Sequence, residues 1–156
     1  NYNDSVEIGS LPDVDTLVVS KINVTSDIQT AIANNYSVKI TERRLANSQS
    51  ENNRATYTNT LANQKETVST NVKNAYNSLV LAKDSYDQAK TSYDLAEKER
   101  AAAELRLSAG TITKKTYEKQ ESACLSAKTS METAKLSFLT AQVTYDWAVA
   151  GLASVS

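Results

Sequence analysis

The apolar pattern is most regular in the second half of the chain. From Val68 onward, a small or apolar side chain recurs at alternating intervals of four and three residues. The series is Val68, Val72, Ala75, Leu79, Ala82, Tyr86, Ala89, Tyr93, Ala96, Arg100, Ala103 and Leu107. This heptad spacing predicts one long helix with a single face held against a partner helix over many turns.

A second series with the same spacing follows Gly110. It runs Tyr117, Gln120, Cys124, Ala127, Met131, Ala134, Phe138, Ala141, Tyr145, Ala148 and Leu152. Two such series separated by a short segment predict an antiparallel helical hairpin. We refer to the two series together as the hairpin seam.

The hairpin seam also predicts a register. If the turn centres on Gly110, the numbers of facing residues sum to about 220. Large side chains then face small ones in nearly every layer, as close packing of two helix faces requires. The central pairs are Ala96 with Cys124, Tyr93 with Ala127, Ala89 with Met131, Tyr86 with Ala134, Ala82 with Phe138, Leu79 with Ala141 and Ala75 with Tyr145. Arg100 faces Gln120. We interpret this polar layer as one that sets the register of the two helices, rather than as a place where water enters between them.

The N-terminal part is less regular. Residues 1–24 contain Pro12 and a β-branched stretch at residues 17–19, and predict an extended lead-in with one short strand. Thr25, Ser26 and Asp27 offer oxygens to cap a helix over about residues 26–50. The polar stretch over residues 49–60 predicts either a turn between two helices or a weak joint within one very long helix.

These elements define an elongated all-α fold. We expect a helical hairpin domain over residues 25–156, with helices at about 26–50, 53–108 and 113–151. The two long helices would measure roughly 80 and 58 Å. A second apolar edge on the last helix is not used by the hairpin seam, and we expect it to cover the first helix rather than to form a subunit interface. This edge consists of Leu136, Leu139, Val143, Trp147 and Ala150.

Composition argues against catalysis. The 156 residues contain no histidine, the commonest general base and metal ligand, and Cys124 falls in the seam as a packed small residue. With 17 basic and 18 acidic residues, the chain has no basic footprint for nucleic acid, and no apolar run is long enough to cross a membrane. We therefore expect no enzyme activity, catalytic residue, cofactor or metal. Because the chain begins with Asn1, we expect a piece of a longer protein.

The turn of the hairpin has its own chemistry. Gly110 lies just after the heptad series, where a left-handed residue commonly ends a helix, and Thr113 can cap the next helix. Lys114 and Lys115 follow in the first turn, where positive charge opposes the helix dipole. The lysines are either simply solvated or part of a docking surface.

The order of these features resembles the repeat of TolC-like outer-membrane efflux proteins. The resemblance rests on Asn74-Ala75-Tyr76 in the first long helix and on Arg106 four residues before Gly110. The last helix adds alanine at every seventh position from Ala127 to Ala148, the pair Tyr145-Asp146, and Gly151 near its end. Residues 27–35 are similar to the short helix that opens such a repeat, so the likeness covers about four fifths of the chain.

The resemblance implies a function and a location. Proteins of this family form trimers whose long helices enclose a periplasmic tunnel, and a periplasmic adaptor protein docks on the tip. By position, the docking tip would be Ser108, Ala109, Gly110 and Thr111. The chain departs from the family at Thr116, where an acidic residue is usual, and at residues 50–60, which are too short and too polar for the family's pair of outer-membrane strands.

Two functional hypotheses follow. The first is the tunnel-forming helical domain of an efflux or secretion duct, located outside the cytoplasm and homo-oligomeric in the full-length protein, without inserting into the membrane itself. The alternative is a structural or adaptor coiled-coil hairpin of the cell envelope with no conduit role. The alternative explains the hairpin seam equally well, but it does not explain the opening helix or the residues of the tip.

Overall fold

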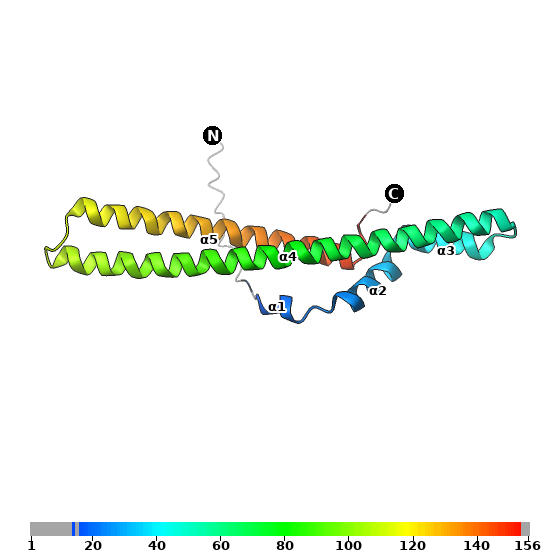
Figure 1. Ribbon diagram of the computed structural model, residues 1–156, viewed down its shortest axis with the longest axis horizontal. Helices are drawn as coiled ribbons and strands as arrows, with labels where there is room; N and C mark the ends of the chain where they lie inside the picture. Colours follow the sequence, from blue (N-terminus) through cyan, green and yellow to red (C-terminus); the bar gives the residue numbers. More distant parts are fainter. Residues whose placement is uncertain (1–13, 15, 154–156) are drawn as a thin grey trace, which may run out of the picture.

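The computed structural model describes residue 14 and residues 16–153, and every regular element in that part of the chain is a helix. The predicted elongated all-α hairpin is confirmed (Figure 1). The helices are α1 (Leu17–Ser20), α2 (Val24–Asn34), α3 (Tyr36–Asn47), α4 (Glu51–Ser108) and α5 (Lys114–Val149). Most of the predicted lead-in, Pro12 included, lies outside the described residues.

Helix α4 is the axis of a rod. It has 58 residues and α5 has 36, so the two helices are about 87 and 54 Å long. Helix α5 returns antiparallel along the C-terminal part of α4, and α3 lies along the N-terminal part that α5 does not reach (Figure 1). The short helices α1 and α2 pack against one side of this rod.

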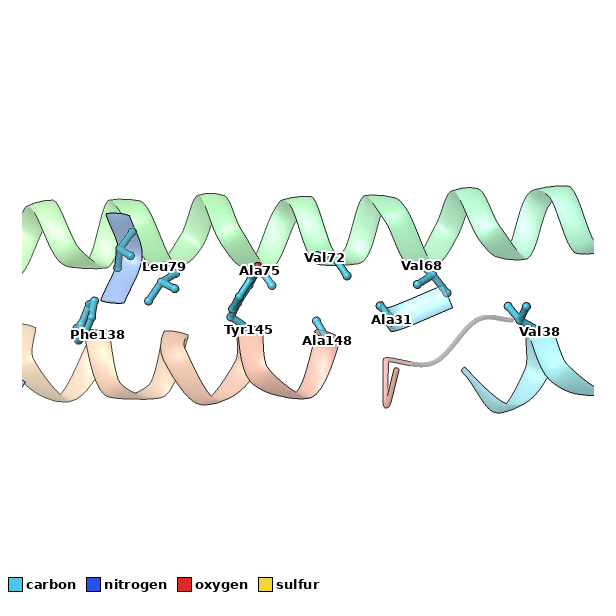
Figure 2. Packing of buried hydrophobic residues seen from close by; sticks show 10 residues of the cluster. Ala31, Val38, Val68, Val72, Ala75, Leu79, Phe138, Tyr145 and Ala148 are labelled. Carbon is cyan, nitrogen blue, oxygen red and sulfur yellow. The ribbon is translucent and has the colours of Figure 1, made fainter. Parts of the chain in front are cut away.

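The hairpin seam lies between α4 and α5. Every seam position from Val68 to Leu107 is buried or half-buried, and so is every position from Tyr117 to Ala148. Burial is deepest at the middle of the rod, where α4 and α5 meet α2 and the start of α3; Figure 2 shows the residues that fill this core. Leu152, the last predicted seam residue, is instead 72% exposed, because α5 ends at Val149 and the chain turns away.

Two ring contacts show the register. Tyr86 stacks on Phe138 with ring centroids 6.5 Å apart, and the rings of Tyr76 and Tyr145 lie 6.1 Å apart. In both pairs the residue numbers sum to within a few units of 220, as the sequence predicts. The layers are less strictly large-against-small than expected, because Tyr86 reaches past its own layer to contact Phe138.

The predicted first helix is wrong in detail, because it is two helices broken at Asn35. With ψ at 125°, the backbone of Asn35 is extended and ends α2. The Asn35 side chain then accepts a hydrogen bond from the Val38 backbone N–H at 3.2 Å and caps α3. The start of α2 also differs from the prediction. Asn23, rather than Thr25, Ser26 or Asp27, is the cap, and its side chain accepts a hydrogen bond from the Ser26 N–H.

The predicted strand at residues 17–19 is also wrong, because these residues form the single turn of α1. No other extended segment lies in the described part of the chain to pair with them, and an isolated strand has no partner for its backbone. Val19, 7% exposed, joins the core instead.

The joint between the first and second long segments is a turn. Residues 48–50 reverse the chain, and α4 begins at Glu51, so the polar stretch up to residue 60 is helical. Helix α3 runs back along α4, and Lys65 pairs with Glu42 across the two helices at 2.9 Å. The N-terminal part of α4 thus packs against the helices that precede it.

Asn35 also fastens the end of α5. Its amide nitrogen donates to the carbonyl oxygens of Gly151 at 3.1 Å and Ala153 at 3.2 Å, and the residue is only 3% exposed. Gly151 has φ of +76°, and a Cβ there would lie 2.8 Å from the backbone nitrogen of Asn35 and 2.9 Å from the backbone oxygen of Ala31. Only glycine fits this conformation and this close approach. One buried amide therefore joins α2, α3 and the end of α5.

A second link joins α2 to α5. The Tyr145 hydroxyl donates to the Asp27 carboxylate at 2.6 Å, and Tyr145 is 4% exposed. Burial, together with this bond to a carboxylate, raises the pKa of Tyr145 well above its usual range. The hydroxyl therefore stays protonated and acts as the donor at neutral pH.

Candidate functional site

The tip of the hairpin is a glycine-terminated helix end. Gly110 has φ of +72°, and its N–H donates to the Leu107 oxygen at 2.9 Å. The Thr111 N–H and hydroxyl both donate to the Arg106 oxygen, each at 2.9 Å. These two backbone bonds form the Schellman arrangement predicted for a helix that ends at a left-handed glycine.

Helix α5 starts from Thr113 as expected. The Thr113 hydroxyl accepts from the Thr116 N–H at 3.2 Å and lies 2.9 Å from the Thr116 hydroxyl. The resembled family usually has an acid at the position of Thr116. Here the Thr116 hydroxyl instead forms a hydrogen bond with the Thr113 hydroxyl, and this bond supports the helix cap. Lys114 lies 3.6 Å from Glu118 on an exposed surface, a geometry that contributes little to stability.

All four predicted tip residues, from Ser108 to Thr111, are exposed. They lie together at the end of the rod farthest from α3 (Figure 1). A Cβ at Gly110 would meet nothing within 4 Å, so the space around the turn is open. Leu105, one turn before the end of α4, is 72% exposed and adds an apolar side chain to this end.

The polar layer near the tip differs from the predicted pair. Arg100 bonds to Glu104 on its own helix at 3.4 Å and lies beside Tyr117 of α5, rather than bonding to Gln120. The Tyr117 hydroxyl is the main cause that raises the pKa of Arg100. The guanidinium therefore lies next to Tyr117 of α5, a residue one turn closer to the tip than Gln120.

The second apolar edge of α5 is open. Leu136, Val143 and Trp147 are 53%, 46% and 62% exposed, so the expectation that the first helix covers them is wrong. Helices α1 and α2 instead approach α5 at Gln142, about a quarter turn from this edge, and at Tyr145, about half a turn from it. At 100° per residue, this outer edge lies on the opposite side of α5 from the hairpin seam. Leu125, 64% exposed, extends the edge toward the tip.

A stripe of hydroxyl residues follows one broad face of the hairpin. Its members on α5 are Ser126, Ser130, Thr133, Ser137, Thr140 and Thr144, spaced strictly four and three and all exposed. From Ser130 on, each hydroxyl donates to the carbonyl four residues earlier. With Asn74, Ser78 and Ser85 of α4, the stripe borders three shallow grooves of about 450 to 570 Å³.

Sequence reasoning did not single out the hydroxyl stripe, although its spacing was visible. Each member stands one position before a seam residue, so it shares the heptad and faces sideways from the seam. The stripe and the side that carries α1 and α2 are therefore opposite broad faces of the rod.

Within the described residues, no group of three or more acidic or cysteine side chains could hold a metal ion. Cys124 is buried in the seam. None of the described helices is long and apolar enough to cross a membrane. Comparison of the chain with protein-family models, with curated proteins and with solved structures found no match.

Proposed function

We propose that this chain is a wall segment of a helical conduit in the cell envelope, the tunnel-forming part of an efflux or secretion duct. The observation that carries the proposal is the pair of opposite apolar edges on α5. One edge packs on α4, and the other exposes Leu136, Val143 and Trp147. A helix in a wall one helix thick needs a neighbour on each side, whereas a helix in a two-stranded spacer needs only one.

The two broad faces support the same proposal. One face carries α1 and α2, so it is too bulky to line a narrow channel. The other face carries the hydroxyl stripe, which is polar but uncharged over about 27 Å from Ser126 to Thr144. Because the hydroxyls already bond to the helix backbone, they offer water a polar surface without a fixed charge that would trap a passing solute.

The exposed tip is the proposed docking site of a periplasmic adaptor protein. Ser108, Ala109, Gly110 and Thr111 present small side chains on a rigid, fully bonded turn. A surface of this kind lets another helical hairpin approach closely. The resemblance to TolC-like repeats supplies the class of partner and implies a trimeric full-length protein.

The proposal that neighbouring chains pack side by side in a wall is tested by measuring self-association. We expect sedimentation equilibrium to show reversible association of the wild type, and the double substitution L136E/V143E to abolish it. The matched control is T133E/T140E, which places two glutamates seven residues apart on the exposed hydroxyl stripe of the same helix. A wild type that stays monomeric at every concentration, or a T133E/T140E variant that dissociates as fully as L136E/V143E, contradicts the proposal.

The tip is tested with a purified adaptor protein. Asparagine tolerates the left-handed conformation better than other side chains, so G110N keeps the turn, and G110D adds one charge to nearly the same shape. We expect G110D to weaken adaptor binding more than G110N. Equal binding by both variants and the wild type counts against docking at the tip and favours the structural coiled-coil hairpin.

A further inference from the structure

The end of the rod opposite the tip contains a basic groove. It has a volume of about 580 Å³ and lies between α3 and the start of α4. Its α3 wall is formed by Ile40, Arg43, Arg44 and Asn47, whose spacing places them on one helix face. The Tyr57 side chain lies on the α4 wall.

The guanidinium groups of Arg43 and Arg44 have no ionic partner in the described part of the chain. Neither Arg43 nor Arg44 makes an ion pair or a hydrogen bond within the described residues, and both side chains are exposed. The nearby acid Glu42 is already paired with Lys65 at 2.9 Å. Arg44 lies in the last turn of α3, where the helix dipole favours a cation, but that position does not account for Arg43.

The start of α4 adds backbone donors to the same groove. Ser48, Gln49 and Asn53 line it, and α4 begins between them at Glu51. The N-cap residue Ser50 makes no side-chain capping bond, in contrast to the residues that cap α2, α3 and α5. The first N–H groups of this 58-residue helix therefore have no acceptor from the cap residue, and Glu51 is the one acid in the same turn.

We propose that this groove binds a phosphate group. Two guanidinium groups supply paired donors that match the phosphate oxygens, and the free N–H groups of α4 supply donors of fixed direction. The Tyr57 ring and Ile40 give the groove an apolar side suited to the carbon part of a phosphate ester. The phosphate belongs either to a lipid headgroup or to a dissolved phosphate compound. This site is independent of the conduit proposed above, since it needs neither the outer edge nor the tip.

The experiment compares two double variants of equal charge change. R43Q/R44Q removes the two arginines from the groove, and K114Q/K115Q removes two lysines from the opposite end of the rod, at the tip. Both substitutions keep good helix formers, and circular dichroism verifies the fold. Binding of inorganic phosphate is followed by amide chemical shifts, and binding to vesicles of phosphatidylglycerol or of phosphatidylcholine is followed by co-sedimentation.

We expect phosphate to shift the amides of residues 40–57, and R43Q/R44Q to weaken this binding by about tenfold or more. K114Q/K115Q should bind like the wild type. Sedimentation with phosphatidylglycerol but not phosphatidylcholine identifies a lipid source, and shifts with inorganic phosphate alone identify a dissolved one. Equal losses in both double variants, shifts spread along the whole rod, or no binding to either probe overturns the proposal.

Discussion

Replacing Asn35 by alanine should destabilise the protein far more than removing an ordinary helix cap. The substitution deletes the capping bond to the Val38 N–H, which is worth about 1 kcal/mol. It also leaves the carbonyls of Gly151 and Ala153 without the amide that bonds them, at a cost of about 1–3 kcal/mol. We therefore expect N35A to lower the free energy of unfolding by about 2–4 kcal/mol.

Asn23 provides the matched control. It caps α2 with the same side chain and the same kind of bond, from the Ser26 N–H at 3.2 Å, but it is exposed and its side chain makes no hydrogen bond to another helix in the described part of the chain. N23A should therefore cost only about 1 kcal/mol. Urea unfolding followed by circular dichroism gives both values, and the difference between them isolates the link to α5.

The variant N35D separates the two roles of the residue. It keeps an oxygen that can cap α3 but replaces the donor to Gly151 and Ala153 with a second acceptor, so oxygen faces oxygen. We expect N35D to be at least as unstable as N35A. If N35A costs no more than N23A, or if N35D retains wild-type stability, Asn35 does not join the helices as argued.

Three further predictions rest on other contacts. Replacing Gly151 by alanine should destabilise the protein by more than the roughly 1 kcal/mol expected for Gly110→Ala, since only the Cβ at residue 151 meets backbone atoms, and equal unfolding midpoints would refute this. Because the pKa of Tyr145 is raised in the folded state, its contribution to stability is complete below pH about 10 and is lost as the pH rises further, so Y145F should show a shallower loss of unfolding free energy at alkaline pH than the wild type. Amide hydrogen exchange should be slowest near Val72 and Phe138 and faster toward the tip, and uniform protection along α4 would contradict the burial pattern.

The hairpin could be predicted because its information is local and repeated. A heptad seam specifies the helix, the face that packs on its partner and the register together, and each of about ten layers of facing residues repeats the same spacing. The left-handed glycine at residue 110 and the Thr113 cap are also local, because each acts within one turn. A mistake at one position, such as Leu152, does not disturb the rest.

The break at Asn35 could not be predicted in the same way. Ile28, Ala31, Ile32 and Val38 continue a helical pattern through it, and asparagine within a helix costs little by itself. What ends α2 there is the set of hydrogen bonds with residues more than a hundred positions away in sequence. The sequence does not predict the open edge of α5 for a related reason. Because the first helix is broken, α3 packs on α4, and among the described helices that precede α4 only α1 and α2 lie beside α5, on another face.

The uneven burial of the rod connects its fold to the proposed function. Around Val72 and Phe138 three or more helices meet and side chains are fully buried (Figure 2). Toward the tip, the described residues show the two helices of the hairpin packed only on each other, and most seam residues are half-buried. Two helices joined through alanine-rich layers bury little apolar area per turn, so the tip half is the less stable end. A wall segment of a conduit would gain the missing stability from neighbours along the outer edge of α5. An isolated spacer has no such source, and its exposed Leu136 and Trp147 would only favour aggregation. The lateral assembly that we propose would account for both the open edge and the weak tip half.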